Sequence, residues 1–262
     1  MISGSITTLN EERHIADCIR SLQQVCDEVI VVDSLSTDRT VEIAKACGAR
    51  VISQEYLGDG PQKNVSRSHV KNDWILSLDA DERLDDDAVA TIRGLDLTRP
   101  THHAYGFRKK NYIGDRWVRC AGLWPAFRGR LYHKQHVRWD DRKGHTKLDA
   151  KKVGLLPGHM LHYAYADYGE YLNKIFRYSR RGARLLHEGG KRTSAVGAVA
   201  HGAFTFFKNY FLRRGWMGGL DGLVVSVISA VGSFMKYAQL RELQRSHQGE
   251  EALSRARSRR TA

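Results

Sequence analysis

The stretch WILSLDADERL, residues 74–84, decides the fold. Its first five residues form a mostly apolar run with the length of a buried strand, and the run ends in Asp79-Ala80-Asp81. Two carboxylates one residue apart at a strand end can share a divalent cation, because Mg²⁺ and Mn²⁺ prefer oxygen ligands. The alternatives are a solvated acidic loop and an EF-hand, and the EF-hand fails because Leu84 occupies its obligatory glycine position.

Strand-like and helix-like segments alternate upstream of this stretch. Residues 2–8, 28–33 and 50–53 are strand-like, and the second of them holds four consecutive β-branched residues. Asn10 is a candidate N-cap for a helix whose apolar face carries Ile15, Cys18, Ile19 and Leu22. Such alternation with short connections predicts an α/β fold with a mostly parallel sheet flanked by helices.

Polar residues stand where these strands end. In open parallel sheets, ligands bind outside the carboxyl ends of the strands. The residues at those ends are Thr7, Thr8, Asn10, Asp33, Ser34, Asp79 and Asp81. Helix capping or a turn is the alternative role for Asn10 and Asp33. Three polar strand ends that converge on one edge favour a ligand site over capping alone.

The rest of the chain changes character twice. Residues 101–165 are rich in Tyr, Trp, His and Arg, and their strand-like pieces are expected to finish the sheet and close the site, which completes a domain over 1–165. Residues 166–245 read as helical and include two apolar stretches, 195–207 and 222–235. No apolar run reaches about 18 residues, so no clear membrane-spanning helix is expected. Residues 246–262 are expected to form a basic flexible tail.

Charge and cysteine content narrow the function classes. The chain has 262 residues, with 42 Lys and Arg against 29 Asp and Glu, for a net charge of +13. This charge suits nucleic acid, an anionic membrane surface or phosphorylated substrates. The basic residues are spread out and no nucleic-acid motif occurs, so nucleic acid is not an expected partner. Four cysteines without a C-x-x-C pair, and the lack of a signal-peptide pattern, indicate reduced thiols and a cytoplasmic protein.

Three segments carry a family resemblance. ITTLNEERHIADCIRSL (6–22), DEVIVVDSLSTDRTVEIAKACGARV (27–51) and WILSLDADERL resemble, in order and spacing, a family 2 glycosyltransferase of the GT-A fold. Later segments, FRKKNYIGDRWVRCAGLWPAFRGRLYHK (107–134) and GHMLHYAYADYGEYLNKIFRYS (158–179), are similar to the lipopolysaccharide-core glucosyltransferase branch. The resemblance extends to about residue 245, and its later motifs are less specific than its first three.

The resemblance implies a site around a nucleotide-sugar donor and a Mg²⁺ or Mn²⁺ cofactor. The donor-binding residues would be Thr8, Asn10, Glu12, Asp33, Ser36, Asp38, Lys63, Asp79 and Arg130. Asp81 would hold the metal, with Asp79 and His162 as further ligands. An ordinary packed or exposed histidine is the alternative for His162.

The catalytic base is less defined. An inverting transfer needs a group that takes the proton of the acceptor hydroxyl. The branch carries a Val-His-Glu motif, which is matched here by residues 143–146, with Thr146 in place of the Glu. The candidates are therefore Asp141 first, then Asp140 and His145. A hydrated turn is the alternative role for Asp141.

The last third suits a membrane interface. Six aromatic residues crowd together between 204 and 216, beside basic residues. Helices that pack on the catalytic domain or on a partner are the alternative, which leaves a homo-oligomer open.

The expected function is an inverting transfer of glucose from UDP-glucose to a membrane glycolipid, such as a lipopolysaccharide core, at the inner face of the cytoplasmic membrane. The alternatives are another donor (heptose or galactose), a polyprenyl-linked or capsular acceptor, or an idle binding protein.

Overall fold

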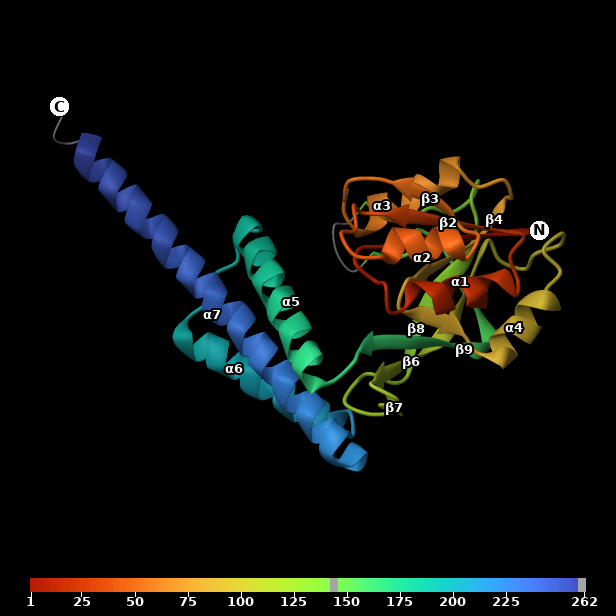
Figure 1. The fold of residues 1–262 in the computed structure, drawn as a ribbon. Coiled ribbons are helices and arrows are strands. Elements are labelled where there is room, and N and C mark those ends of the chain that lie inside the picture. The colour runs from red at the N-terminus through yellow and green to blue at the C-terminus, as the bar shows by residue number, and fades with distance from the viewer. Residues whose placement is uncertain (142–145, 259–262) are drawn as a thin grey trace. The chain divides into compact units, whose positions relative to one another are not determined.

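The computed structural model describes the backbone of residues 1–141 and 146–258, and the side chains of those up to residue 246 (Figure 1). The chain divides into two compact units, one of residues 1–112 and 125–164, the other of residues 113–124 and those from 165 onward. The strands are β1 Ile2–Thr8, β2 Glu28–Asp33, β3 Arg50–Ser53, β4 Trp74–Asp79, β5 Glu82–Leu84, β6 Ala104–Ile113, β7 Arg116–Trp117, β8 Ala126–His133 and β9 Gly154–Tyr165. The α-helices are α1 Ile15–Gln23, α2 Thr40–Ala46, α3 Asp59–Val65, α4 Asp86–Arg93, α5 Tyr168–Glu188, α6 Ala195–Phe207 and α7 Gly219–Ser258.

Half of the sheet in the first unit is parallel, with strand order β3-β2-β1-β4. Apolar side chains alternate between its two faces. One face packs against α1, α2 and α4, and the other packs against a cluster around Trp139. Each fully buried Ile or Leu contributes about 1.5–3 kcal/mol, so the core fixes the strands and therefore the places where they end. The predicted α/β fold with flanking helices is confirmed by the strand order and the helices that cover the sheet.

The other half of the sheet is antiparallel and continues in the order β8-β6-β9-β5. A bulge interrupts β8: Tyr105 pairs with Leu131 and Gly106 with Gly129, which leaves Arg130 as an extra residue. The bulge allows the adjacent side chains of Arg130 and Leu131 both to be buried. A Cβ at Gly106 would lie 2.2 Å from the backbone oxygen of residue 128, so the close approach of the two strands requires glycine.

The first helix begins later than the sequence indicates. It starts at Ile15 after His14, whose side chain makes no capping hydrogen bond, so the prediction of Asn10 as an N-cap is wrong. The backbone N–H groups of His14 and Ile15 both donate to the Glu11 carbonyl, which makes a separate turn before the helix. Asn10 lies ahead of this turn with φ of 54°, and its side chain contacts a neighbouring loop instead of the helix.

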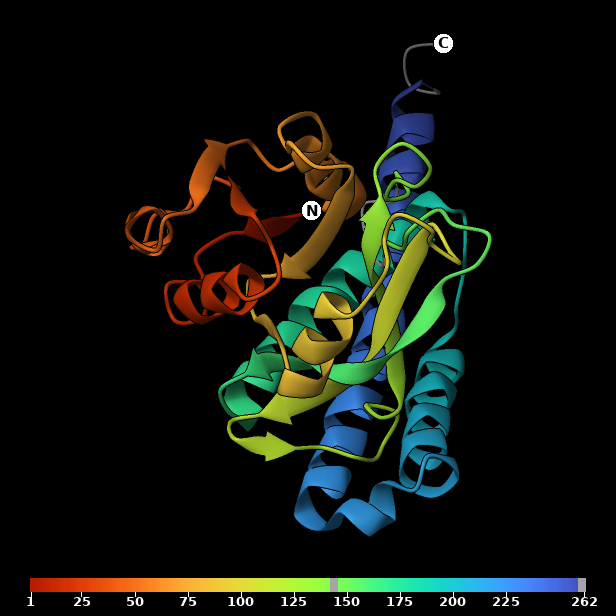
Figure 2. The same ribbon diagram turned by 90° about the vertical axis from the view of Figure 1, so that its right-hand side faces the viewer.

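The second unit is helical. Helix α6 (cyan) lies alongside α7 (blue) in Figure 2, and α5 also packs on α7. A π-helical turn at Lys208–Leu212 and a 3-10 turn at Gly215–Gly218 join α6 to α7. The core of this unit includes Ile113, Tyr171 and Val225.

The apolar stretch 222–235 lies inside a much longer continuous helix. By length and composition, residues Gly215–Ser246 form a helical segment that could cross a membrane, and the mean hydropathy of its apolar 18-residue window is 1.5. The length of this segment was not expected from the sequence, because the helix continues past the apolar stretch on both sides. A core helix of a soluble protein meets the same criteria, although only 28% of the apolar window is buried here. The helix also runs on to Ser258, through much of the tail that was expected to be flexible.

Candidate active site

The carboxyl ends of β1, β2 and β4 bring polar side chains together on one edge of the sheet. Thr8 is the register partner of Asp33, and Thr7 is the register partner of Asp79. Thr8 is buried, and its hydroxyl oxygen has no hydrogen-bond partner within the described residues. A buried hydroxyl without a partner costs free energy, which a bound ligand group at this edge would recover.

The loops that follow β1 and β2 are held together by side chains. Ser36 donates its hydroxyl to Asp33 Oδ1 at 2.5 Å and its backbone N–H to Asp33 Oδ2 at 2.9 Å. The Asn10 N–H donates to Ser36 Oγ at 2.8 Å, and Asn10 Oδ1 accepts from the Thr37 N–H at 2.8 Å. Leu35 has φ of 66°, which is uncommon for a leucine and is seen most often at functional loops. The structure therefore brings together three predicted donor-binding residues, Asn10, Asp33 and Ser36.

Glu12 and Asp38 join the same two loops. Asp38 Oδ2 accepts from the Glu12 N–H at 3.2 Å, and Glu12 Oε2 accepts from the Arg39 N–H at 3.2 Å. Asp38 Oδ1 also accepts from the Thr40 hydroxyl at 2.5 Å. Burial raises the pKa of Asp38, but hydrogen bonds from Thr40 and Glu12 outweigh it and hold that pKa below its ordinary value. Both carboxylates support the loops, so their contribution to a donor pocket is its shape.

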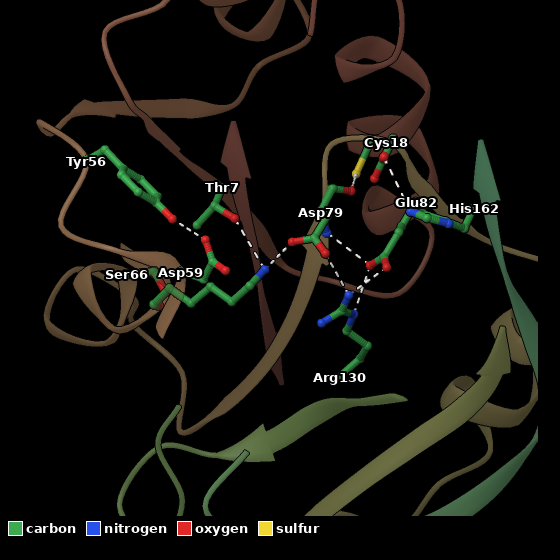
Figure 3. Close-up of polar contacts among 11 residues, drawn as sticks. Thr7, Cys18, Tyr56, Asp59, Ser66, Asp79, Glu82, Arg130 and His162 are labelled. Atoms are coloured by element: carbon green, nitrogen blue, oxygen red, sulfur yellow. Dashed lines mark hydrogen bonds and ion pairs between the residues drawn. The ribbon is translucent and has the colours of Figure 1, made fainter. Parts of the chain in front are cut away.

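Lys63 contacts Thr7 and Asp79 at the ends of β1 and β4. Figure 3 shows these two residues side by side. The side chain comes from α3 and is buried, and its ammonium pairs with Asp79 and donates to Thr7 Oγ1 at 3.3 Å. The Trp139 ring lies over this ammonium, with its centroid 5.1 Å from Nζ. Asn64 holds Trp139 in place through two hydrogen bonds with its backbone, at 2.9 and 3.0 Å. Helix α3 thus supplies both the cation and the residue that orients its aromatic cover.

Arg130 connects Asp79 to the buried Glu82 (Figure 3). Its Nη2 lies 2.7 Å from Asp79 Oδ2 and 2.6 Å from Glu82 Oε1, and its Nε lies 2.8 Å from Glu82 Oε2. Burial raises the pKa of Asp79, but Lys63 and Arg130 outweigh it and hold that pKa well below its usual range. Burial lowers the pKa of Arg130, and the carboxylates of Glu82 and Asp79 outweigh this effect. Asp79 is therefore ionised at neutral pH, with both oxygens engaged.

Asp81 and His162 form a second cluster beside this network. His162 Nε2 lies 3.4 Å from Asp81 Oδ2, and His162 Nδ1 lies 2.8 Å from Asn111 Oδ1. A hydrogen bond from Nδ1–H to Asn111 leaves the Nε2 lone pair on the side of Asp81, which is how metal-binding histidines are usually oriented. Within the described residues, no group of three or more His, Cys, Asp or Glu side chains could hold a metal ion. Two protein ligands fit a Mg²⁺ or Mn²⁺ ion that takes its other ligands from a diphosphate and water.

The candidate bases lie after Trp139. Asp140 accepts from the Thr146 hydroxyl at 2.7 Å and from the Lys147 N–H at 3.3 Å, so its carboxylate supports a turn. Asp141 is 68% exposed and lies 3.4 Å from Arg138. His145 lies outside the described residues. A Cβ at Gly60 would lie 1.7 Å from the Asp140 carbonyl oxygen, so this segment packs closely on the start of α3, the helix of Lys63.

Three residues of the site, Glu82, Asn111 and Trp139, were not predicted from the sequence. In β5, Glu82 and Leu84 are buried and Arg83 between them is less so. Because side chains alternate along a strand, the position of Glu82 two residues before Leu84 could have placed it on the inner face. Asn111 and Trp139 carry no comparable signal, because their contacts come from distant parts of the chain.

Comparisons with known proteins place these features in context. The model of Glycosyl transferase family 2 matches residues 5–154. An uncharacterised glycosyltransferase of Rickettsia typhi is 36% identical over 256 residues, which cover 92% of this chain and 87% of the relative. The lipopolysaccharide core biosynthesis glycosyltransferase LpsC of Rhizobium meliloti is 26% identical and covers 91% of each chain. A crystal structure of glucosyl-3-phosphoglycerate synthase from Mycobacterium tuberculosis is 27% identical over 43% of this chain and 44% of that chain, with a TM-score of 0.34.

Proposed function

Because this chain belongs to glycosyl transferase family 2, we propose that it is an inverting, metal-dependent hexosyltransferase that moves glucose from UDP-glucose onto a membrane glycolipid. The chain is a glycosyltransferase, as its family and its relatives show. The name of LpsC, a lipopolysaccharide core biosynthesis glycosyltransferase, supports a core oligosaccharide as the acceptor. The observation that carries the proposal is the Asp81–His162 pair, oriented by Asn111 and placed next to the ionised Asp79.

The donor nucleotide would bind at the ends of β1 and β2. Asp33 is buried at 2% exposure, and each of its oxygens retains acceptor capacity beyond its bond from Ser36. A uracil ring has one N–H that such a carboxylate can accept. The unpaired hydroxyl of Thr8 lies beside Asp33 and offers a further polar contact.

The diphosphate and the sugar would lie at the end of β4. Asp81 and His162 would hold the divalent ion, which supplies a Lewis acid for the departing diphosphate when it is bound. Lys63 and Arg130 keep Asp79 ionised, and an ionised carboxylate can accept hydrogen bonds from sugar hydroxyls. In this proposal Asp79 orients the donor sugar, while Asp81 and His162 are the metal ligands.

In the transfer step, the acceptor oxygen bonds to the anomeric carbon as the bond from that carbon to the diphosphate breaks. The acceptor proton passes to a base on the opposite side of the sugar from the diphosphate. Asp141 is the first candidate because its carboxylate is 68% exposed. Asp140 and His145 are the alternatives, and Asp140 would first have to release its hydrogen bond from Thr146.

Transfer assays with different donors test this function. Radiolabelled UDP-glucose, UDP-galactose, GDP-mannose and ADP-heptose are each incubated with the protein, Mn²⁺ and lipopolysaccharide-containing bacterial membranes. We expect label from UDP-glucose in the lipopolysaccharide fraction, a loss of at least about a hundredfold in Asp81→Asn, and no loss in the exposed control Asp86→Asn. Transfer from ADP-heptose or UDP-galactose instead would contradict the donor assignment. Label in polyprenyl-linked lipid or capsule would contradict the acceptor assignment.

The second unit is proposed to bind the cytoplasmic face of the inner membrane. Its large exposed apolar side chains cluster on α6, on the turn after it and at the start of α7: Val196, Val199, Phe204, Phe207, Phe211, Leu212, Trp216, Met217 and Leu220. Arg213 and Arg214 are exposed within this patch. Apolar side chains beside cations suit an anionic lipid surface, where each cation contributes about 1 kcal/mol.

Vesicle flotation tests this membrane proposal. The protein should float with phosphatidylglycerol-containing vesicles and only weakly with pure phosphatidylcholine. Trp216→Ser should reduce the bound fraction several-fold, whereas Tyr178→Ser, an aromatic control that is 49% exposed on α5, should leave it unchanged. Equal binding by both variants would contradict the role of the patch.

A further inference from the structure

Two cations of the antiparallel half lie on one face of the sheet. The register pairs Phe107 of β6 with Arg128 of β8, and Lys109 with Ala126. Because side chains alternate along a strand, Lys109 and Arg128 project from the same face as diagonal neighbours. Along this face Phe107 is fully buried in the core of the first unit, Lys109 is half-buried and Arg128 is exposed, so the two cations lie where the core gives way to the surface.

Neither cation has a carboxylate partner within the described residues. The Lys109 ammonium forms no hydrogen bond there, and the guanidinium of Arg128 donates only to the Phe127 carbonyl of its own strand, at 2.9 Å. The charges of Glu82 and Asp79 act on Lys109. Both are already bonded by Arg130.

Lys109 is therefore a half-buried cation without a directly bonded carboxylate among the described residues. Burial lowers its pKa, the Glu82 carboxylate opposes this effect, and the charges of Arg130 and Arg128 add to it. A desolvated charge that lacks a partner costs free energy, and an anionic ligand would remove that cost. The fork of Arg128 matches the paired oxygens of a phosphate or a carboxylate.

The donor nucleotide has its proposed partners elsewhere. The residues proposed for its base lie on β1 and β2, whereas β8 and β6 follow on the opposite side of β4. In the proposed function, Asp81 and His162 take the diphosphate through the metal. Lys109 and Arg128 are thus available to a different anion.

We propose that Lys109 and Arg128 bind a phosphate or carboxylate group on the acceptor saccharide. This proposal rests on the proposed function and adds the chemical class of its acceptor. Arg108 offers a matched control, because it directly precedes Lys109 in β6 and carries the same charge. It is exposed, and its side chain projects from the opposite face of the sheet.

Calorimetric titration tests the proposal with three derivatives of glucose that differ in charge: glucose 6-phosphate, glucuronate and methyl glucoside. Each is titrated into the protein with UDP and Mn²⁺ at saturation, so that the donor site is filled. At least one anionic probe should bind about tenfold or more tightly than methyl glucoside. Lys109→Met and Arg128→Ala should each remove most of this preference, and Arg108→Ala should retain it.

The affinity for UDP is measured in the same variants. Unchanged UDP affinity in Lys109→Met supports an acceptor site. Weaker UDP binding with no loss of affinity for the anionic probes would mean that Lys109 binds the donor nucleotide, which overturns the proposal. Equal binding of charged and neutral probes, or binding of none, also overturns it. A protein that binds an anionic probe but no UDP contradicts the proposed donor site alone. Arg128 is exposed, so its variant gives a folded test if Lys109→Met unfolds.

Discussion

The two halves of the sheet in the first unit build the site in different ways. In the parallel half, functional side chains stand at strand ends and in loops, and in the loops after β1 and β2 hydroxyl and backbone N–H groups hold them, as Ser36 holds Asp33. In the antiparallel half they come from within strands, and buried side chains hold them, as Glu82 holds Arg130. The loops after β1 and β2 therefore depend on hydrogen bonds within and between turns, whereas the antiparallel half depends on ion pairs between residues distant in the sequence.

The largest expected effect comes from the buried ion pair of the antiparallel half. Arg130→Met leaves the fully buried Glu82 without its partner, so the free energy of unfolding should fall by about 3–5 kcal/mol. Urea denaturation measures this change. The double variant Arg130→Met/Glu82→Gln should recover much of the loss because no unpaired charge remains.

The control for this prediction is an exposed pair of the parallel half. Arg39 and Glu42 are 69% and 66% exposed, so Arg39→Met should leave the unfolding transition almost unchanged. Similar losses in Arg130→Met and Arg39→Met would contradict the difference between the two halves.

The next effect concerns the orientation of His162. Asn111→Leu removes the acceptor of the Nδ1 hydrogen bond, so the Mn²⁺ concentration for half-maximal transfer should rise about 10–100-fold. The rate at saturating Mn²⁺ should change much less, which separates weaker metal binding from a lost catalytic group. Asn72→Leu, at a position remote from His162 in the sequence and at the other end of β4, serves as the control. An unchanged Mn²⁺ requirement in Asn111→Leu would show that His162 needs no orientation from Asn111.

A smaller effect is expected in the loops of the parallel half. Ser36→Ala removes the hydroxyl bond to Asp33 and the acceptor of the Asn10 N–H, at a cost of about 1–2 kcal/mol of stability. The KM for the donor should rise several-fold with little change in kcat, because the variant loosens a binding loop. Ser68→Ala, at an exposed position, should change neither parameter. A fall in kcat alone would contradict a role in donor binding.

The smallest expected effect is a change in the stability contribution of Asp79 that appears only at acidic pH. The pKa of Asp79 is lower in the folded state than its unfolded value of about 3.9. Its stabilising contribution is therefore complete above about pH 5, and it is lost as the pH falls through the unfolded value toward the folded one. The stability difference between the wild type and Asp79→Asn should be constant from pH 7 to 5 and shrink below about pH 4. A difference that shrinks between pH 7 and 5 would show that Asp79 is not held ionised.

The sequence predicted the parallel half better than the antiparallel half for a physical reason. An apolar run that ends in a polar residue marks a strand end, so Thr8, Asp33 and Asp79 could be placed on one edge before the structure was known. The signal for Glu82 is weaker: its alternation with Leu84 in β5 indicates the inner face, but the burial of an acid follows only from its ion pair with Arg130 of β8. The bulge that positions Arg130 depends on the pairing of two strands and leaves no period in the sequence.

The helical unit shows the same limit. Residues 195–207 were predicted as an apolar stretch, and α6 has the same bounds. The length of α7 was not predicted, because the residues that extend it beyond 222–235 are polar, and α5 and α6 pack along part of it.

Electron paramagnetic resonance of Mn²⁺ tests most directly the claim that the two halves meet at one metal and donor site. Mn²⁺ should bind tightly to the wild type only when UDP is present, because the protein supplies two ligands and the diphosphate supplies others. Asp81→Asn and His162→Gln should each abolish this binding, and Asp86→Asn should retain it. Mn²⁺ binding that is independent of UDP, or unchanged in both variants, would contradict the account.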